Sequence, residues 1–252
     1  MHKTRPEARE LAGAVRDALE TERDLPAVVL CPSFTSLEPV LQVCVNSPLA
    51  VGAQNMDHRD SGAYTGEISP PMLLELGVKY VIIGHSERRQ FFGETNATVN
   101  LKLKAAVRHG LIPIVCVGET VDERENHLTD AVVSRQTAAA LDDLDAAQLS
   151  GLIVAYEPVW AIGTGKVCEA VEANRVAAVI RSTIGNLYAN RDLAASIPVL
   201  YGGSVKASNI DEQLAQPELD GALVGGASLN AEEFVAIIRS AQKKVQPAAA
   251  KS

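Results

Sequence analysis

Several absences in the sequence exclude whole classes of protein. The four cysteines, Cys31, Cys44, Cys116 and Cys168, lie far apart and form no CxxC pair. This spacing speaks against a zinc site or a disulfide framework and favours reduced, buried thiols. No apolar run approaches the ~18 residues of a membrane span, and the charged opening MHKTRPEARE has no apolar segment typical of a secretion signal. We therefore expect a cytoplasmic protein with no metal site and no membrane contact.

Positive charge is also scarce. The sequence has 23 Lys and Arg against 31 Asp and Glu, which gives a net charge of −8. A protein that grips nucleic acid regardless of sequence needs a basic face, so we expect no nucleic-acid partner. A specific anion pocket stays possible, because a few backbone N–H groups can build one without net positive charge.

What is present is one repeated pattern: a short apolar run, a polar or Gly-rich turn, and a longer helical stretch. The apolar runs are Ala27–Cys31, Leu49–Gln54, Tyr80–His85, Ile112–Gly118, Leu152–Glu157, Pro198–Gly203 and Gly221–Gly226. Each run is continuously apolar, as expected of parallel strands covered on both faces. The helical stretches are Arg5–Glu22, Thr95–His109, Thr129–Asp145, Cys168–Ala189, Ser208–Ala215 and Asn230–Lys244. The alternation predicts one parallel α/β sheet, open or closed.

The chain length suits one α/β barrel of about 250 residues. No Pro, Gly or Ser-rich linker divides it, so we expect a single domain over residues 1–244 and a frayed C-terminal tail over residues 245–252. The predicted strands number seven, one fewer than a closed eight-stranded barrel needs, because the chain opens directly in a helix.

One strand end carries a histidine. The segment Tyr80–Arg88 reads YVIIGHSER, so His85 ends the strand while Ser86 and Glu87 open a short helix. A helix N-terminus presents unpaired N–H groups and a partial positive charge, which disfavour a protonated imidazole. We expect His85 to be a neutral hydrogen-bond donor; the alternative is a histidine with a purely structural role.

Another strand ends in a carboxylate. Leu152–Lys166 reads LIVAYEPVWAIGTGK, and Glu157 at the end of a buried strand is costly without a partner or a function. Pro158 stiffens the start of the following loop, while Gly163 and Gly165 free its end. Such a loop can close over a ligand and exclude water. We predict a base beside a lid, against an ordinary loop beside a salt-bridged Glu.

The last two strand ends carry paired glycines, in LYGGSV (Leu200–Val205) and ALVGGA (Ala222–Ala227). Bare N–H groups at such loops can approach a phosphate closely. One pair alone would fit a tight turn equally well, but two pairs at neighbouring strand ends, one beside Ser204, favour a phosphate site.

The segment Gln54–Ser69 exceeds the usual 2–6 residues of a loop between strand and helix. A flexible excursion is one explanation. Because the segment contains Met56 and Tyr64, we favour a contact with a second subunit.

Together these parts suit proton abstraction beside a carbonyl group on a small phosphorylated substrate, with no cofactor. At this point the chain resembles the triosephosphate isomerase family. The resemblance runs from Arg5 to about Lys244 and rests on four motifs in the family's order: GHSERR (Gly84–Arg89), AYEPVWAIGTGK (Ala155–Lys166), YGGSV (Tyr201–Val205) and LVGGASL (Leu223–Leu229).

The resemblance implies a (β/α)8 TIM barrel that interconverts dihydroxyacetone phosphate and D-glyceraldehyde 3-phosphate through an enediolate, in glycolysis and gluconeogenesis. It also implies the site residues. Glu157 moves the proton between two carbons, His85 polarises the carbonyl oxygens, and Glu87 is a further catalytic residue. Gly163, Ser204, Gly225 and Gly226 hold the phosphate. Gln54–Ser69 docks into the partner of a homodimer.

One part of the family's pattern is missing from the printed sequence. The family opens with a first strand ending in Gly-Asn-Trp-Lys-Met, whose Asn and Lys contact the substrate. This sequence begins MHKT, and Lys3 is no evident substitute because it lies past the matching position. An ammonium ~4 Å from an anion is worth about 4 kcal/mol at an effective dielectric of about 20. We expect the chain as printed to fold poorly and to be weakly active, and the natural start to lie upstream of Met1.

Two other functions stay open. Another phosphate-binding barrel, such as a different sugar-phosphate isomerase or an indole-pathway enzyme, would share the glycine pairs but not His85 and Glu157 joined to this loop. A catalytically silent barrel that binds phosphate metabolites, or a dimerisation scaffold, would suit the absent Lys.

Overall fold

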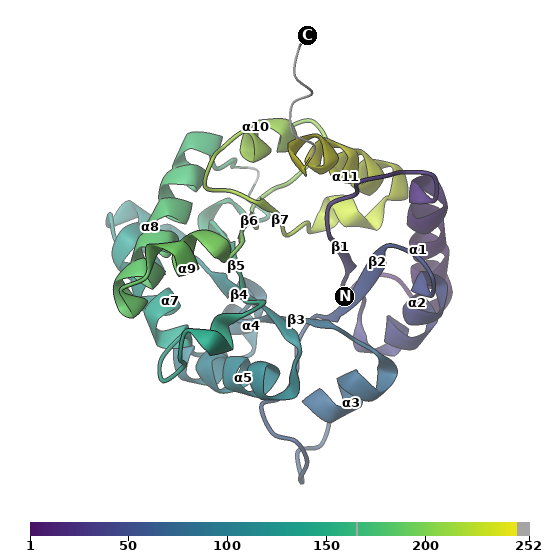
Figure 1. The fold of residues 1–252 in the computed structure, drawn as a ribbon, viewed down its shortest axis with the longest axis horizontal. Helices are drawn as coiled ribbons and strands as arrows, with labels where there is room; N and C mark the ends of the chain where they lie inside the picture. The colour runs from purple at the N-terminus through teal and green to yellow at the C-terminus, as the bar shows by residue number, and fades with distance from the viewer. Residues whose placement is uncertain (165, 246–252) are drawn as a thin grey trace.

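The computed structural model describes residues 1–164 and 166–245. Within these ranges, seven parallel strands pair in chain order from β1 to β7. They are β1 (Val28–Leu30), β2 (Leu49–Ala53), β3 (Tyr80–Ile83), β4 (Ile112–Val117), β5 (Ile153–Tyr156), β6 (Val199–Tyr201) and β7 (Gly221–Ala222). Figure 1 shows these strands around the centre of the molecule, with the helices forming an outer ring. The fold is a curled β/α barrel of the TIM type.

The helices lie on the outside of the sheet; α1 precedes β1, α11 follows β7, and the others lie between successive strands. They are α1 (Arg5–Leu19), α2 (Leu37–Cys44), α3 (Pro70–Leu76), α4 (Ser86–Phe91), α5 (Asn96–His109), α6 (Val121–Glu125), α7 (Thr129–Ala140), α8 (Ala170–Tyr188), α9 (Arg191–Ser196), α10 (Ile210–Leu214) and α11 (Ala231–Val245). Short 3-10 turns are η1 (Phe34–Ser36), η2 (Ala147–Leu149), η3 (Val159–Ala161) and η4 (Gly226–Leu229). In the described part of the chain, no helix is both long and apolar enough to cross a membrane.

Each of the seven apolar runs contains a strand, which confirms the predicted parallel sheet. The last strand is shorter than predicted: β7 covers Gly221–Ala222, whereas the apolar run extends to Gly226. Its partner β6 ends at Tyr201, whose carbonyl accepts one more bond from the N–H of Leu223 at 2.9 Å. Beyond that residue the chain has no strand to pair with on this side, and it turns into η4. The tail predicted over residues 245–252 lies outside the described residues from 246 onward.

Side chains alternate between the two faces of the sheet. Val81 and Ile83 of β3 pack in the large core shared with the helices. Ile82, Ile114, Cys116 and Ala155 form a separate small cluster that contains no buried helix residue. Because successive strand residues point to opposite faces, this second cluster lines the inside of the barrel. Glu157 lies two residues after Ala155, so its position continues the inner face.

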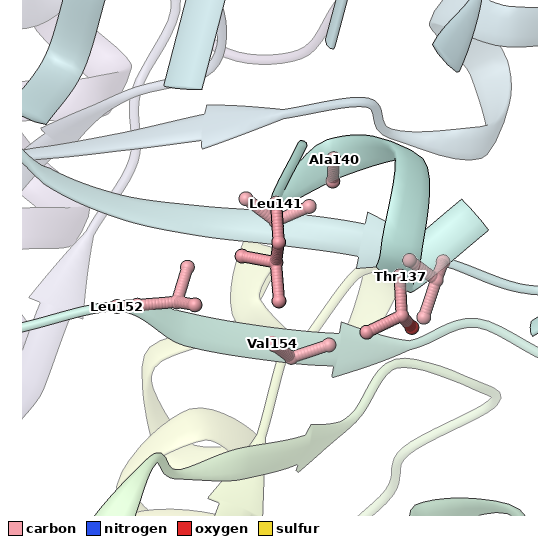
Figure 2. A pocket seen from close by; sticks show the side chains of 7 residues that line it. Thr137, Ala140, Leu141, Leu152 and Val154 are labelled. Atoms are coloured by element: carbon pink, nitrogen blue, oxygen red, sulfur yellow. The ribbon is translucent and has the colours of Figure 1, made fainter. Parts of the chain in front are cut away.

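A small apolar pocket lies on the outer face of the sheet, between α7 and strands β4 and β5. Figure 2 shows its lining: Val115, Val117, Thr137, Ala140, Leu141, Leu152 and Val154. The hydroxyl of Thr137 is buried there without a hydrogen-bond partner among the described residues. The other lining residues are apolar, so the pocket offers a ligand little polar recognition.

Candidate active site

The candidate residues gather at one rim of the barrel. All described strands run parallel, so their C-terminal ends meet at the same edge. His85 follows β3, Glu157 follows β5, Ser204 follows β6, and Gly225 with Gly226 follows β7. Residues that are far apart in the sequence are thereby brought to one end of the sheet, where parallel β/α folds place their chemistry.

His85 and Glu157 face each other directly. The Nε2 atom of His85 lies 3.0 Å from Oε1 of Glu157. The same carboxylate accepts hydrogen bonds from the main-chain N–H of Ser86 at 2.9 Å and from the Ser86 hydroxyl at 3.1 Å. The helix N-terminus of α4 therefore supplies the groups that hold the carboxylate of β5, and it does so across the rim of the barrel.

Glu157 is a buried carboxylate, and its burial increases its affinity for a proton. Its side chain is 2% exposed. Burial raises the pKa of Glu157 above its usual value, although the hydrogen bonds from Ser86 lower it in part. A carboxylate taken out of water binds a proton more strongly, so Glu157 suits the acceptance of a proton from carbon better than an exposed Glu would.

The hydrogen bonds of His85 select the tautomer of the neutral ring that carries its proton on Nε2. His85 is the N-cap of α4, and its Nδ1 accepts the main-chain N–H of Glu87 at 3.3 Å. An Nδ1 that accepts carries no proton, so Nε2 is the donor of the neutral ring. Ser86 and Glu87 open α4 as predicted. The side chain of Glu87 is 69% exposed, with Oε2 3.9 Å from Nδ1 of His85.

Two ionic side chains, the buried Glu94 and the half-buried Arg89, fix the main chain immediately before His85. Glu94 Oε1 accepts the N–H of Gly84 at 2.9 Å, and Nε of Arg89 donates to the Gly84 carbonyl at 2.8 Å. Burial raises the pKa of Glu94, but hydrogen bonds from Lys102 and Arg88 and the charge of Lys102 lower it by more, so the pKa lies below its usual value. Glu94 is therefore a carboxylate at neutral pH, and it acts here as a fixed acceptor.

The segment after Glu157 is anchored at its first turn. Trp160, in η3, donates from Nε1 to Glu119 at 2.8 Å. Glu119 is fully buried at the end of β4 and also accepts the hydroxyl of Tyr156 at 3.2 Å. Burial raises the pKa of Glu119. Gly163 has a φ of +70°, a conformation that suits glycine, whereas the predicted second hinge at Gly165 lies outside the described residues.

One predicted phosphate-binding residue, Ser204, contacts the start of this segment. The hydroxyl of Ser204 donates to the carbonyl of Ala161 at 3.3 Å, which joins the loop after β6 to the loop after β5. Gly225 and Gly226 are exposed just after β7, and a Cβ built on either glycine would meet nothing within 4 Å. Because neither glycine carries a side chain, a ligand can approach the main chain closely here, as an anion cradle requires.

The loop Gln54–Ser69 projects beyond the ring of helices, between β2 and α3 at the lower edge of Figure 1. Tyr64 is exposed, and Arg59 lies over its ring at 3.8 Å. The inclusion of Met56 among the signs of a subunit contact is wrong. Met56 is fully buried in the core of its own chain, because the first residues of the loop still pack under the sheet.

Sequence reasoning missed several supporting residues of the site, among them Ser86, Glu94 and Glu119 as hydrogen-bond partners. Ser86 lies within a motif that was singled out, but its bond to Glu157 joins residues 71 positions apart. Glu119 was detectable: it is a carboxylate directly after a buried strand, the same signal that pointed to Glu157.

The family model and the relatives that match this chain all carry the same description. A family model described as triosephosphate isomerase matches residues 1–241. A triosephosphate isomerase of Synechococcus sp. (strain JA-3-3Ab) is 53% identical over 99% of this chain and 94% of the relative. One of Moorella thermoacetica is 55% identical over 94% of both chains, and one of Clostridium tetani is 54% identical over 84% of this chain and 82% of the relative.

Proposed function

Because the chain belongs to the triosephosphate isomerase family, we propose that Glu157 and His85 carry out its reaction at the rim of the barrel. The enzyme is an isomerase that interconverts dihydroxyacetone phosphate and D-glyceraldehyde 3-phosphate. This interconversion needs a proton taken from the carbon beside a carbonyl and returned to the neighbouring carbon. The reaction belongs to glycolysis and gluconeogenesis, and a cytoplasmic location fits that pathway.

The observation that carries this proposal is the 3.0 Å approach of His85 Nε2 to Glu157 Oε1. In the proposed mechanism, Glu157 removes the proton from one carbon and delivers it to the other. The Nε2–H of His85 donates to the carbonyl oxygen, which gains negative charge as the enediolate forms. A neutral donor is suited to both oxygens in turn, because it can give a proton and take one back. Glu87 supports His85 through its main-chain N–H, which holds the ring in this tautomer.

We propose that the substrate's phosphate is held by the N–H groups of Gly163, Gly225 and Gly226 together with Ser204. The contact of Ser204 with Ala161 supports this, since it places the lid segment beside the loop after β6. Closure of residues 159–164 over the bound phosphate would exclude water and protect the enediolate.

Inhibitor binding tests whether this rim is a working site. We expect 2-phosphoglycolate, which resembles the enediolate intermediate, to bind at least about a hundredfold more tightly than inorganic phosphate. Isothermal titration of the full chain with both ligands measures this ratio, and a coupled assay with glyceraldehyde 3-phosphate measures turnover in parallel. Equal affinity for the two ligands, with no turnover, would instead identify a silent phosphate-binding barrel.

We further propose that the enzyme is a homodimer that docks through Gln54–Ser69. Exposed Tyr64 stacked on Arg59 gives the loop an apolar, partly rigid surface. Asp60, in the middle of the loop, ties it to the end of α5: its carboxylate accepts a hydrogen bond from Arg108 at 2.8 Å and lies 2.7 Å from His109 Nε2. A projecting loop held in this way loses little conformational entropy when it binds a partner.

Substitution of Tyr64 with Glu is expected to weaken the dimer at least tenfold, because a charge would be buried against the partner. Sedimentation equilibrium over a range of concentrations measures the dissociation constant. Leu187→Glu, which changes an exposed apolar residue of α8, is the matched control and should leave association unchanged. A parent protein that sediments as a monomer at micromolar concentration would refute the dimer.

A further inference from the structure

Glu157 is packed between two glycines on the neighbouring strand ends. A Cβ on Gly118, after β4, would lie 1.7 Å from the Glu157 carbonyl oxygen. A Cβ on Gly202, after β6, would lie 3.0 Å from Cγ of Glu157. The main chain of Glu157 therefore rests directly on Gly118, while its side chain passes Gly202. The main chains of Gly118 and Glu157 are thus in contact, so a shift of Gly118 toward Glu157 would have to move the residue that carries the carboxylate.

The main chain of Gly118 is held by a side chain rather than by a strand. The Val117 carbonyl already accepts the N–H of Glu157 at 2.8 Å, so the polar groups of Gly118 point to the opposite side, where β3 has ended. Gln136 of α7 fills this place. Its Oε1 accepts the Gly118 N–H at 2.7 Å, and its Nε2 donates to the Gly118 carbonyl at 3.1 Å.

This pair of bonds is enclosed within the protein. Gln136 is 9% exposed, and both hydrogen bonds are buried. Loss of the amide would leave a buried N–H and a buried carbonyl without partners, at a cost of about 1–3 kcal/mol for each group. The strand end would then shift to find other partners. The shift would displace Glu157 on one side, and on the other side Glu119, which follows Gly118 and holds Trp160.

We propose that Gln136 is a positioning residue for the isomerase reaction, acting on Glu157 through the main chain of Gly118. It touches no reacting atom. It fixes the position of the main chain at the end of β4, which contacts the main chain of Glu157. The inference depends on the proposed role of Glu157 as the base, because only a misplaced base would make a distant amide matter for turnover. A displacement near 1 Å can lower a rate by roughly a hundredfold.

The test compares Gln136→Leu with Val133→Ala in the full chain. Leu keeps the volume of Gln136 and removes both hydrogen bonds. Val133→Ala creates a cavity one turn earlier in the same helix and removes no hydrogen bond. We expect Gln136→Leu to lower kcat about tenfold or more with KM within about threefold. Val133→Ala should keep kcat within about twofold at an equal folded fraction. Equal kcat values in both variants would overturn the proposal.

Gln136→Glu gives an independent reading if the Leu variant does not fold. A protonated carboxyl can both accept from Gly118 and donate to it, whereas an ionised one would face the Gly118 carbonyl with like charge. We expect kcat relative to the parent to rise as the pH falls from 8.5 to 6, and a flat ratio would overturn the proposal. Glu157→Asp, measured alongside, separates the two proposals: if it alone loses turnover, only the role of Gln136 fails.

Discussion

Replacement of Glu157 with Asp is expected to lower kcat by at least about a hundredfold, or about 2.7 kcal/mol in activation free energy. Asp keeps the carboxylate but shortens the side chain by one methylene group. The base is then withdrawn from the carbon that it must reach. The loss should appear in kcat rather than in KM, because Glu157 does not hold the phosphate.

Glu157→Gln should remove nearly all turnover and yet leave the fold at least as stable at pH 7. Because burial raises the pKa of Glu157 in the folded protein, the ionised carboxylate opposes folding at neutral pH. This cost is absent below the pKa of the unfolded state, near 4.5, and appears as the pH rises through the higher pKa of the folded state. The stability advantage of Gln over Glu should therefore shrink as the pH falls from 7 to 4.

Urea unfolding across this pH range measures the stability difference, and steady-state assays in both directions measure kcat. Glu125→Asp, at an exposed position in α6, is the control and should leave both quantities unchanged. Unaltered turnover in Glu157→Asp would remove Glu157 from the mechanism. A Gln variant that is less stable than the parent at pH 7 would contradict the burial cost.

The strands were predictable because each is covered on both faces. Runs such as Ile112–Gly118 are apolar throughout, and this pattern does not depend on the rest of the fold. The short helices α2 (Leu37–Cys44) and α9 (Arg191–Ser196) were missed. A segment of six to eight residues spans about two turns or fewer, too little for a helical period to stand out. Their formation depends on packing against neighbouring helices and, in α9, on the Asn190 cap.

The site was predictable where its chemistry is local. His85 and Glu157 end apolar strands, and the rule that parallel strands share a rim then places them together. Their supporting partners depend on contacts between distant residues. Trp160 reaches Glu119 over 41 positions, and Gln136 reaches Gly118 over 18. An amide in the middle of a helix, such as Gln136, has no sequence signature, because its role arises only where β3 stops short of β4.

Replacement of His85 with Gln is expected to lower kcat by roughly 10²–10⁴-fold, the usual contribution of a positioned acid–base group. The Gln amide is close to imidazole in length and can still donate a hydrogen bond to the carbonyl oxygen. It cannot give up a proton and take it back, so the enediolate oxygens must exchange protons by a slower route. We therefore expect substrate affinity to change much less than turnover.

Nitrogen-15 NMR of the parent protein tests the tautomer of His85, and the same substitution identifies the signals of this ring by their loss. In the parent, Nδ1 accepts from the N–H of Glu87 and Nε2 lies 3.0 Å from Glu157. Nitrogen-15 NMR of the imidazole should show one neutral tautomer with its proton on Nε2. His127→Gln, at an exposed position, is the control for both measurements. If His85→Gln turned over at the parent rate, the carbonyl would have to be polarised by another group. A ring that carried two protons at pH 7 would have the same consequence, because it would form an ion pair with the ionised Glu157 and hold the base.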